Sequence, residues 1–241
     1  MAVQNSLKEI PDKKITYQVN GENVTLSPSI VRTYLTNGNG NVTDQEIVYF
    51  LNLCKYQKLN PLTKEVYLVK YGNQPATTIT GKDALLKRAM RNPKYAGHQA
   101  GVIVKNNETG KLEYRIGALV LETETLVGGW AKTFVKGYEQ PIESSVSINE
   151  YIGLTKEGNV NSMWATKPGT MIRKVALVTS LRESFPEDLS GMYDSSEMGV
   201  DFDETGASPT IDIPQDNTTP PEFFDSVEDL DDFPMDELEQ F

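Results

Sequence analysis

The stretch KLNPLTKEVYLVKY, residues 58–71, marks a change from helical to strand periodicity. Before it, apolar residues between Ile47 and Cys54 repeat at helical spacing behind the capping-box sequence TDQE at 43–46. Pro61 excludes a continuous helix, because the residue before a proline is pushed out of the α region. The residues then alternate, so we expect a strand over 63–71 that carries Lys64 and Lys70 among tyrosines.

The flanking sequence predicts an α+β domain. KITYQVNGENVTL, residues 14–26, is typical of a β-hairpin because Asn20-Gly21 suits a type I′ turn. The expected order is ββαβββα, which favours an antiparallel sheet packed against helices. Helices are expected at 29–35, 82–91, 147–152 and 168–185, and further strands at 75–80, 99–105, 111–122 and 130–137.

The charge is unevenly distributed along the chain. The net charge of the 241 residues is −11, but residues 187–241 hold eighteen acids and no Lys or Arg. Residues 1–186 therefore keep 16 acids and all 23 bases, a net charge of +7. We expect a flexible arm at 1–13, a basic nucleic-acid-binding domain at 14–186, and an acidic, disordered tail at 187–241.

Residues for catalysis are sparse. His98 and Cys54 are the only histidine and cysteine, which excludes a His/Cys metal site and an internal disulfide. We expect Cys54 in the core and His98 at the surface before a strand. ATTITGKD, residues 76–83, resembles a P-loop but has Ala76 and Asp83 where Gly and a hydroxyl are needed. The sequence therefore predicts no enzyme, no catalytic residue, no metal and no cofactor.

The sequence predicts neither a signal peptide nor a transmembrane helix. The first residues lack the apolar core of a signal peptide, and no run of about 18 apolar residues predicts a transmembrane helix. The single cysteine fits a reducing compartment. We expect a cytoplasmic protein with no membrane partner.

Lysines, arginines and aromatic residues are interleaved through the basic part. Between residues 55 and 115, twelve bases stand against four acids. In WAKTFVKGY, residues 130–138, Trp130, Lys132, Phe134 and Lys136 share one strand face. Cations that follow phosphates beside rings that stack on bases are what single-stranded nucleic acid needs. Arg182 lies on the apolar stripe of the last helix, where a half-buried guanidinium needs an anionic partner.

Three segments resemble a known family. LNPLTKEVY (59–67), WATKPGTMIRKVALVTSLRESF (164–185) and MYDSSE (192–197) are similar to phage single-strand annealing recombinases of the Redβ/RecT kind, the phage recombination protein Bet. The resemblance covers residues 40–197. It implies an α+β core, assembly into rings or helical filaments on DNA, and pairing of complementary strands without ATP or catalysis.

The resemblance also implies functional residues. Lys64, Arg173 and Arg182 match basic positions of the family motifs. The chain departs from the Redβ branch at Gly169-Thr170 and Val175, where that branch has basic residues, and in its acidic tail, which replaces a small helical partner-binding domain. The candidate DNA-binding residues are Lys64, Lys70, Lys82, Lys87, Arg88, Arg91, Lys132, Lys136, Lys167, Arg173, Lys174 and Arg182, and the candidate base-stacking residues are Tyr67, Tyr71, Trp130 and Trp164.

The predicted function is ATP-independent binding and annealing of single-stranded DNA in homologous recombination and repair, by an oligomer in the bacterial host of a bacteriophage. Expected partners are single-stranded DNA, the annealed duplex, further copies of the chain, a phage exonuclease and the host single-stranded-DNA-binding protein. Two alternatives stay open: a Mg-dependent nuclease that uses scattered carboxylates, and a passive single-strand-binding protein. The tail, in which DLDDFPM (229–235) resembles the acidic tip of bacterial single-stranded-DNA-binding proteins, can act in solubility, in competition with DNA, or in docking.

Overall fold

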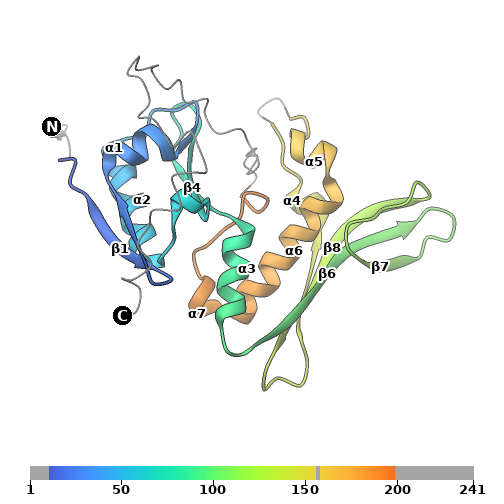
Figure 1. Cartoon of the computed structure of the whole chain (residues 1–241). Helices are drawn as coiled ribbons and strands as arrows, with labels where there is room; N and C mark the ends of the chain where they lie inside the picture. The colour runs from blue at the N-terminus through green and yellow to red at the C-terminus, as the bar shows by residue number, and fades with distance from the viewer. Residues whose placement is uncertain (1–10, 156–157, 199–241) are drawn as a thin grey trace, which may run out of the picture. The chain divides into compact units, whose positions relative to one another are not determined.

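The computed structural model describes residues 11–155 and 158–198 (Figure 1). These residues form a mixed α+β structure with largely antiparallel sheets and several helices, as the sequence predicts. The sheets have two, three and four strands, in the orders β1-β2, β3-β4-β5 and β7-β6-β8-β9.

The N-terminal hairpin forms as predicted. Strands β1 (Ile15–Val19) and β2 (Glu22–Leu26) pair antiparallel across Asn20-Gly21, whose φ angles of 56° and 89° are those of a type I′ turn. Its inward face is apolar, and the Tyr17 hydroxyl donates a buried hydrogen bond of 2.7 Å to the Leu59 carbonyl. This bond ties the hairpin to the start of the motif at 59–67.

Helix α2 (Asp44–Gln57) follows α1 (Pro28–Ile30) and the π-helical turn η1 (Val31–Leu35). Its capping box is complete: the Thr43 hydroxyl accepts from the Glu46 N–H, and the Glu46 carboxylate accepts from the Thr43 N–H at 2.7 Å. Cys54 is fully buried on the apolar face, which confirms the core prediction.

The three-stranded sheet differs from the prediction. β3 (Thr36–Gly38) pairs parallel with β4 (Val66–Lys70), which pairs antiparallel with β5 (Thr77–Thr80). A strand of three residues is too short to show any periodicity, so the parallel pair was not predicted. β4 also begins later than residue 63, because Pro61–Thr63 form the 3-10 turn η2.

A four-stranded antiparallel sheet forms the larger layer. After α3 (Lys82–Arg91) come β6 (Tyr95–Asn106), β7 (Leu112–Ile116), β8 (Glu124–Val135) and β9 (Ile142–Ser147). The predicted strand 111–122 ends at 116, and β9 was missed because its IESSVS sequence is rich in serine. His98 lies within β6 and is half-buried, so its placement before a strand was wrong.

Helix α6 (Pro168–Ser184) covers one face of this sheet, between the short helices α4 (Ile148–Tyr151), α5 (Ser162–Thr166) and α7 (Pro186–Leu189) (Figure 1). Thr133 and Ser180 hydroxyls share a buried hydrogen bond of 2.7 Å between sheet and helix. The other face of β8 carries Trp130, Lys132 and Phe134, which agrees with the predicted alternation.

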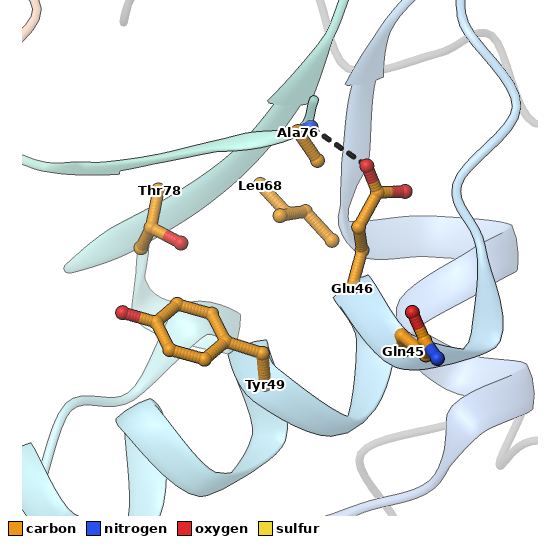
Figure 2. Close-up of a pocket in the computed structure, with 6 residues that line it drawn as sticks. All are labelled: Gln45, Glu46, Tyr49, Leu68, Ala76 and Thr78. Carbon is orange, nitrogen blue, oxygen red and sulfur yellow. Dashed lines mark hydrogen bonds between the residues drawn. The ribbon is translucent and has the colours of Figure 1, made fainter. Parts of the chain in front are cut away.

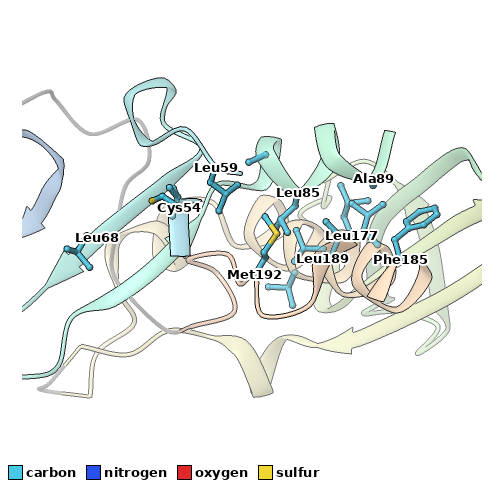
Figure 3. Close-up of a cluster of buried hydrophobic side chains, with 14 of the residues drawn as sticks. Cys54, Leu59, Leu68, Leu85, Ala89, Leu177, Phe185, Leu189 and Met192 are labelled. Carbon is cyan, nitrogen blue, oxygen red and sulfur yellow. The ribbon is translucent and has the colours of Figure 1, made fainter. Parts of the chain in front are cut away.

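The core continues past the boundary predicted at residue 186. Figure 3 shows Leu189 and Met192 packed with Leu85, Leu177 and Phe185, and both are at most 1% exposed. The segment also joins β5, because the Thr80 N–H donates to the Tyr193 carbonyl at 2.8 Å. Residues 187–198 therefore belong to the packed domain, while the tail residues 199–241 and the arm residues 1–10 lie outside the described residues.

Candidate nucleic-acid interface

A cleft of about 560 Å³ lies between the turn η2, the start of β4 and the helix α3. Two cations and one aromatic ring from the predicted set line it: Lys64, Lys87 and Tyr67. Leu86 and Met90 add apolar wall, and Met90 is 58% exposed. Glu65 and Asp83 also line the cleft, so its two lysines stand beside two carboxylates and an apolar wall. Lysines next to apolar and aromatic surface are features that single-stranded nucleic acid can use.

Hydrogen bonds within the LNPLTKE segment, residues 59–65, form a turn that leaves Lys64 exposed. The Asn60 side chain accepts from the Leu62 N–H at 3.0 Å, and the Glu65 carboxylate accepts from the Asn60 N–H at 3.0 Å. The chain then turns at Lys64, whose φ of 60° is left-handed, a conformation that costs a non-glycine residue free energy. Lys64 is exposed at this turn and not on the strand that the sequence predicted.

Lys87 reaches the cleft from α3. Its Nζ lies 3.7 Å from Glu65 Oε1, and its side chain is 56% exposed. The Glu65 side chain is only 10% exposed, so the pair is open to water on the lysine side alone. At 3.7 Å the ammonium can turn toward a phosphate, while Glu65 keeps its hydrogen bond from the Asn60 N–H.

A second group of predicted cations surrounds His98. Burial lowers the pKa of His98, and the nearby charges of Arg173 and Lys82 lower it further. Arg173 donates to the Ala100 carbonyl at 3.2 Å, and Lys82 lies 3.2 Å from the exposed carboxylate of its neighbour Asp83. The positive charges of Arg173 and Lys82, which add to the effect of burial on His98, can also attract an anion.

Two of the predicted DNA-binding residues, Lys70 and Arg88, bind partners within the fold. Lys70 is 7% exposed, and its Nζ lies 2.9 and 2.8 Å from the two carboxylate oxygens of Glu46. Arg88 donates to Gln57 and to the Asp188 carbonyl, which ties α3 to α2 and α7. Both side chains join elements of the fold, so we leave them out of the interface.

Lys174 and Arg182 are held by the segment after α7. Lys174 Nζ lies 3.0 Å from the fully buried Asp194. Arg182 donates to both oxygens of Glu197 at 2.7 and 2.6 Å and lies over the Tyr193 ring at 4.6 Å. The anionic partner expected for Arg182 is thus a residue of the same chain. A glutamate fifteen residues later carried no sequence signal for this pairing.

The tryptophans are not open to bases. Trp164 is 2% exposed in the core, and Trp130 is 5% exposed with its indole N–H 3.3 Å from the Arg115 carbonyl. Tyr67 and Tyr71 are half-buried. Among the predicted stacking residues, Tyr67 alone lines the cleft.

The remaining predicted cations are spread over other surfaces. Lys132 pairs with Glu143 at 3.0 Å on the open face of the four-stranded sheet, 5.9 Å from the Trp130 ring. Arg91, Lys136 and Lys167 are exposed, and Arg91 donates to the Asn20 side chain. Since the sheet separates Lys132 from α3 and α6, these residues do not all share one groove with Lys64.

A smaller pocket of about 190 Å³ lies between α2 and the β4-β5 pair (Figure 2). Sequence reasoning did not single it out. Its one charged residue is Glu46, which accepts from the Ala76 N–H at 2.8 Å, and its most open wall is Tyr49, 65% exposed. Among the described residues, no lysine or arginine lines this pocket to attract a phosphate, so we assign it no DNA contact.

The described residues hold no cluster of three or more His, Cys, Asp or Glu that could bind a metal ion. In the same part of the chain, no helix is long and apolar enough to span a membrane.

The described residues form an α+β fold with a cleft that Lys64, Tyr67 and Lys87 help to line. The RecT family model matches residues 23–210, so the chain belongs to the RecT family. This confirms the resemblance drawn from the three sequence segments. The RecT family implies phage recombination by single-strand annealing.

A curated relative is the uncharacterized protein UU154 of Ureaplasma parvum serovar 3. It is 30% identical over 158 residues, which cover 64% of this chain and 61% of the relative. The chain therefore spans about three fifths of the length of that relative.

Proposed function

We propose that this protein binds single-stranded DNA through the cleft of Lys64, Tyr67 and Lys87 and anneals it to a complementary strand without ATP. The observation that carries the proposal is the cleft itself. It joins an outward lysine from the family motif to a weakly paired lysine and an aromatic ring. Membership of the RecT family supports the same activity.

The cleft suits annealing because its two lysines can contact phosphates beside an apolar wall, although Glu65 and Asp83 also line it. Lys64 and Lys87 can form ion pairs with phosphates, which carry no sequence information. Tyr67, Leu86 and Met90 offer surface to a sugar or a base face, and stacking contributes about 1–3 kcal/mol per base. A strand held by its backbone keeps its base edges free for a complement.

Lys82, on the same helix α3 as Lys87, and Arg173 of α6 supply further positive charge. Exposed Arg91, Lys136 and Lys167 add sequence-independent attraction. Copies of the chain assemble along the strand, so that many weak contacts give avidity. A phage exonuclease that supplies single strands and the host single-stranded-DNA-binding protein are the further partners in this proposal.

The test mixes purified protein with two labelled complementary oligonucleotides in the absence of ATP. Gain of duplex above the spontaneous rate is expected. Shortened strands in Mg²⁺ would instead identify a nuclease, and a stable protein–DNA complex without duplex gain would identify a passive binding protein.

The role of the cleft is tested by DNA titrations with Lys64→Ala and Lys87→Ala. Lys13→Ala, at an exposed lysine just before β1, is the control. Each cleft variant should weaken binding alike on all sequences and reduce the slope of log K against log salt by about 0.7. Lys13→Ala should leave the slope unchanged. Wild-type slopes in both cleft variants would remove the cleft from the proposal.

A further inference from the structure

Strand β7 is an exposed edge of the four-stranded sheet, which ends in the order β7-β6-β8-β9 (Figure 1). Its residues Leu112, Tyr114 and Ile116 are 58%, 58% and 68% exposed. Natural sheet edges are usually protected by lysine, proline or a bulge. The β7 sequence LEYRI has no lysine or proline, and its pairing with β6 has no bulge.

The direction of the β7 backbone groups follows from the hydrogen bonds at its two ends. The Asn106 N–H donates to the Lys111 carbonyl at 2.9 Å, and the Gly117 N–H donates to the Ala100 carbonyl at 3.1 Å. In an antiparallel pair such bonds recur at every second residue. Glu113 and Arg115 therefore face β6, and the N–H and C=O groups of the residues between them point outward.

The outward groups belong to Leu112, Tyr114 and Ile116, the same residues whose apolar side chains are exposed. Within residues 11–155 and 158–198, no hydrogen bond satisfies these three N–H groups. β7 therefore offers both requirements for strand addition, namely free backbone groups and exposed apolar side chains.

The β7 sequence is complementary to itself in the antiparallel direction. When two copies are centred on Tyr114, Leu112 lies opposite Ile116 of the partner on one face. On the other face, Glu113 lies opposite Arg115 of the partner. Arg115 already pairs with Glu124 and, at 3.3 Å, with Glu113, which is 51% exposed and can reach a second guanidinium. Opposite charges directly across strands are stabilising.

We propose that β7 pairs with β7 of a second copy about a two-fold axis at Tyr114, which joins the two four-stranded sheets into one. The backbone direction agrees with this register, because the three outward residues form the hydrogen-bonded pairs. The contact specifies a surface for the self-assembly proposed above, on which it rests, but it needs no DNA. Its failure is thus distinguishable from failure of annealing.

The register is tested by disulfide capture, since the native Cys54 is fully buried. Tyr114→Cys should cross-link to itself, because hydrogen-bonded antiparallel pairs have Cα atoms about 5.5 Å apart, within disulfide reach. Leu112→Cys and Ile116→Cys should not cross-link alone but should do so when mixed. Tyr138→Cys, at a residue 62% exposed in another turn, should form no cross-link under the same oxidation.

The association is tested by light scattering of the DNA-free chain over a concentration series. Glu113→Lys places like charges opposite each other twice per dimer and should raise the dimer dissociation constant at least about tenfold. Tyr114→Pro removes an outward N–H and should do the same, while circular dichroism shows whether the fold is kept. A wild-type chain that stays monomeric and does not cross-link would overturn the proposal, as would dimers that both variants leave intact.

Discussion

Lys64 shows how far a single residue was predictable. The family motif predicted that it contacts DNA, and the structure exposes it in the cleft with Lys87. Its left-handed backbone was not predictable, because it results from the closed hydrogen bonds between Asn60 and Glu65. The turn, and not a strand, points this lysine outward.

Replacing Lys64 by glycine separates charge from backbone conformation. Glycine adopts φ of 60° freely, so Lys64→Gly should be more stable than Lys64→Ala by about 1 kcal/mol. Both variants lack the ammonium and should lose DNA affinity equally. Urea unfolding and a DNA titration on the two proteins check this, and recovery of affinity in the glycine variant would contradict the phosphate role.

The titration of Glu46 makes the stability of the fold depend on pH. Burial tends to raise its pKa, but Lys70 and the N–H groups of Thr43 and Ala76 lower the pKa to about 2. Since the folded pKa lies below the ordinary value of 4.5, this stabilisation is complete above pH 4.5 and is lost as the pH falls toward 2.

Glu46→Gln should therefore lower the free energy of unfolding by about 2 kcal/mol at pH 7, because it leaves the buried Lys70 without its counter-charge. The gap to the wild type should narrow between pH 4.5 and 2. Denaturant unfolding across this pH range measures it, and a gap independent of pH would contradict the assignment.

At the scale of elements, alternation and capping predicted what depends on neighbours in sequence. The hairpin around Asn20-Gly21, the capping box at Thr43 and the two faces of β8 are all present. The parallel pair β3-β4 was missed because its partners are distant in sequence, and β9 was missed because its serine-rich sequence hides its pairing with β8.

The contact between α6 and the sheet depends on Gly129. A Cβ at this position would lie 2.4 Å from the Ile172 carbonyl oxygen, so helix and strand would have to separate. Gly129→Ala should lower the free energy of unfolding by about 2 kcal/mol. Thermal unfolding checks this, with Ser145→Ala at an exposed position of β9 as the control that should change little.

At the scale of the whole molecule, the packed domain includes residues 187–198. Leu189 and Met192 fill the core beside α3 and α6, and Asp194 and Glu197 match the charges of Lys174 and Arg182. The acidic composition of this segment had predicted that it belongs to the tail. Four of those eighteen acids lie in this packed segment.

A chain that ends at residue 186 should therefore fold poorly or lose more than about 5 kcal/mol, since it exposes apolar surface and leaves Lys174 and Arg182 without partners. A chain that ends at residue 198 keeps these contacts. Circular dichroism melting of the two truncations measures the difference, and equal melting temperatures would show that residues 187–198 contribute little.

The sequence by itself determined the family, the basic character of residues 1–186, the hairpin and the capping box, since each depends on residue type and short spacing. Only the tertiary structure decided which cations are free. Lys70, Arg88, Lys174 and Arg182 are taken up by partners far along the chain, and Trp130 and Trp164 are covered. A charge is available to a ligand only where folding places no counter-charge beside it, and that depends on packing between distant segments.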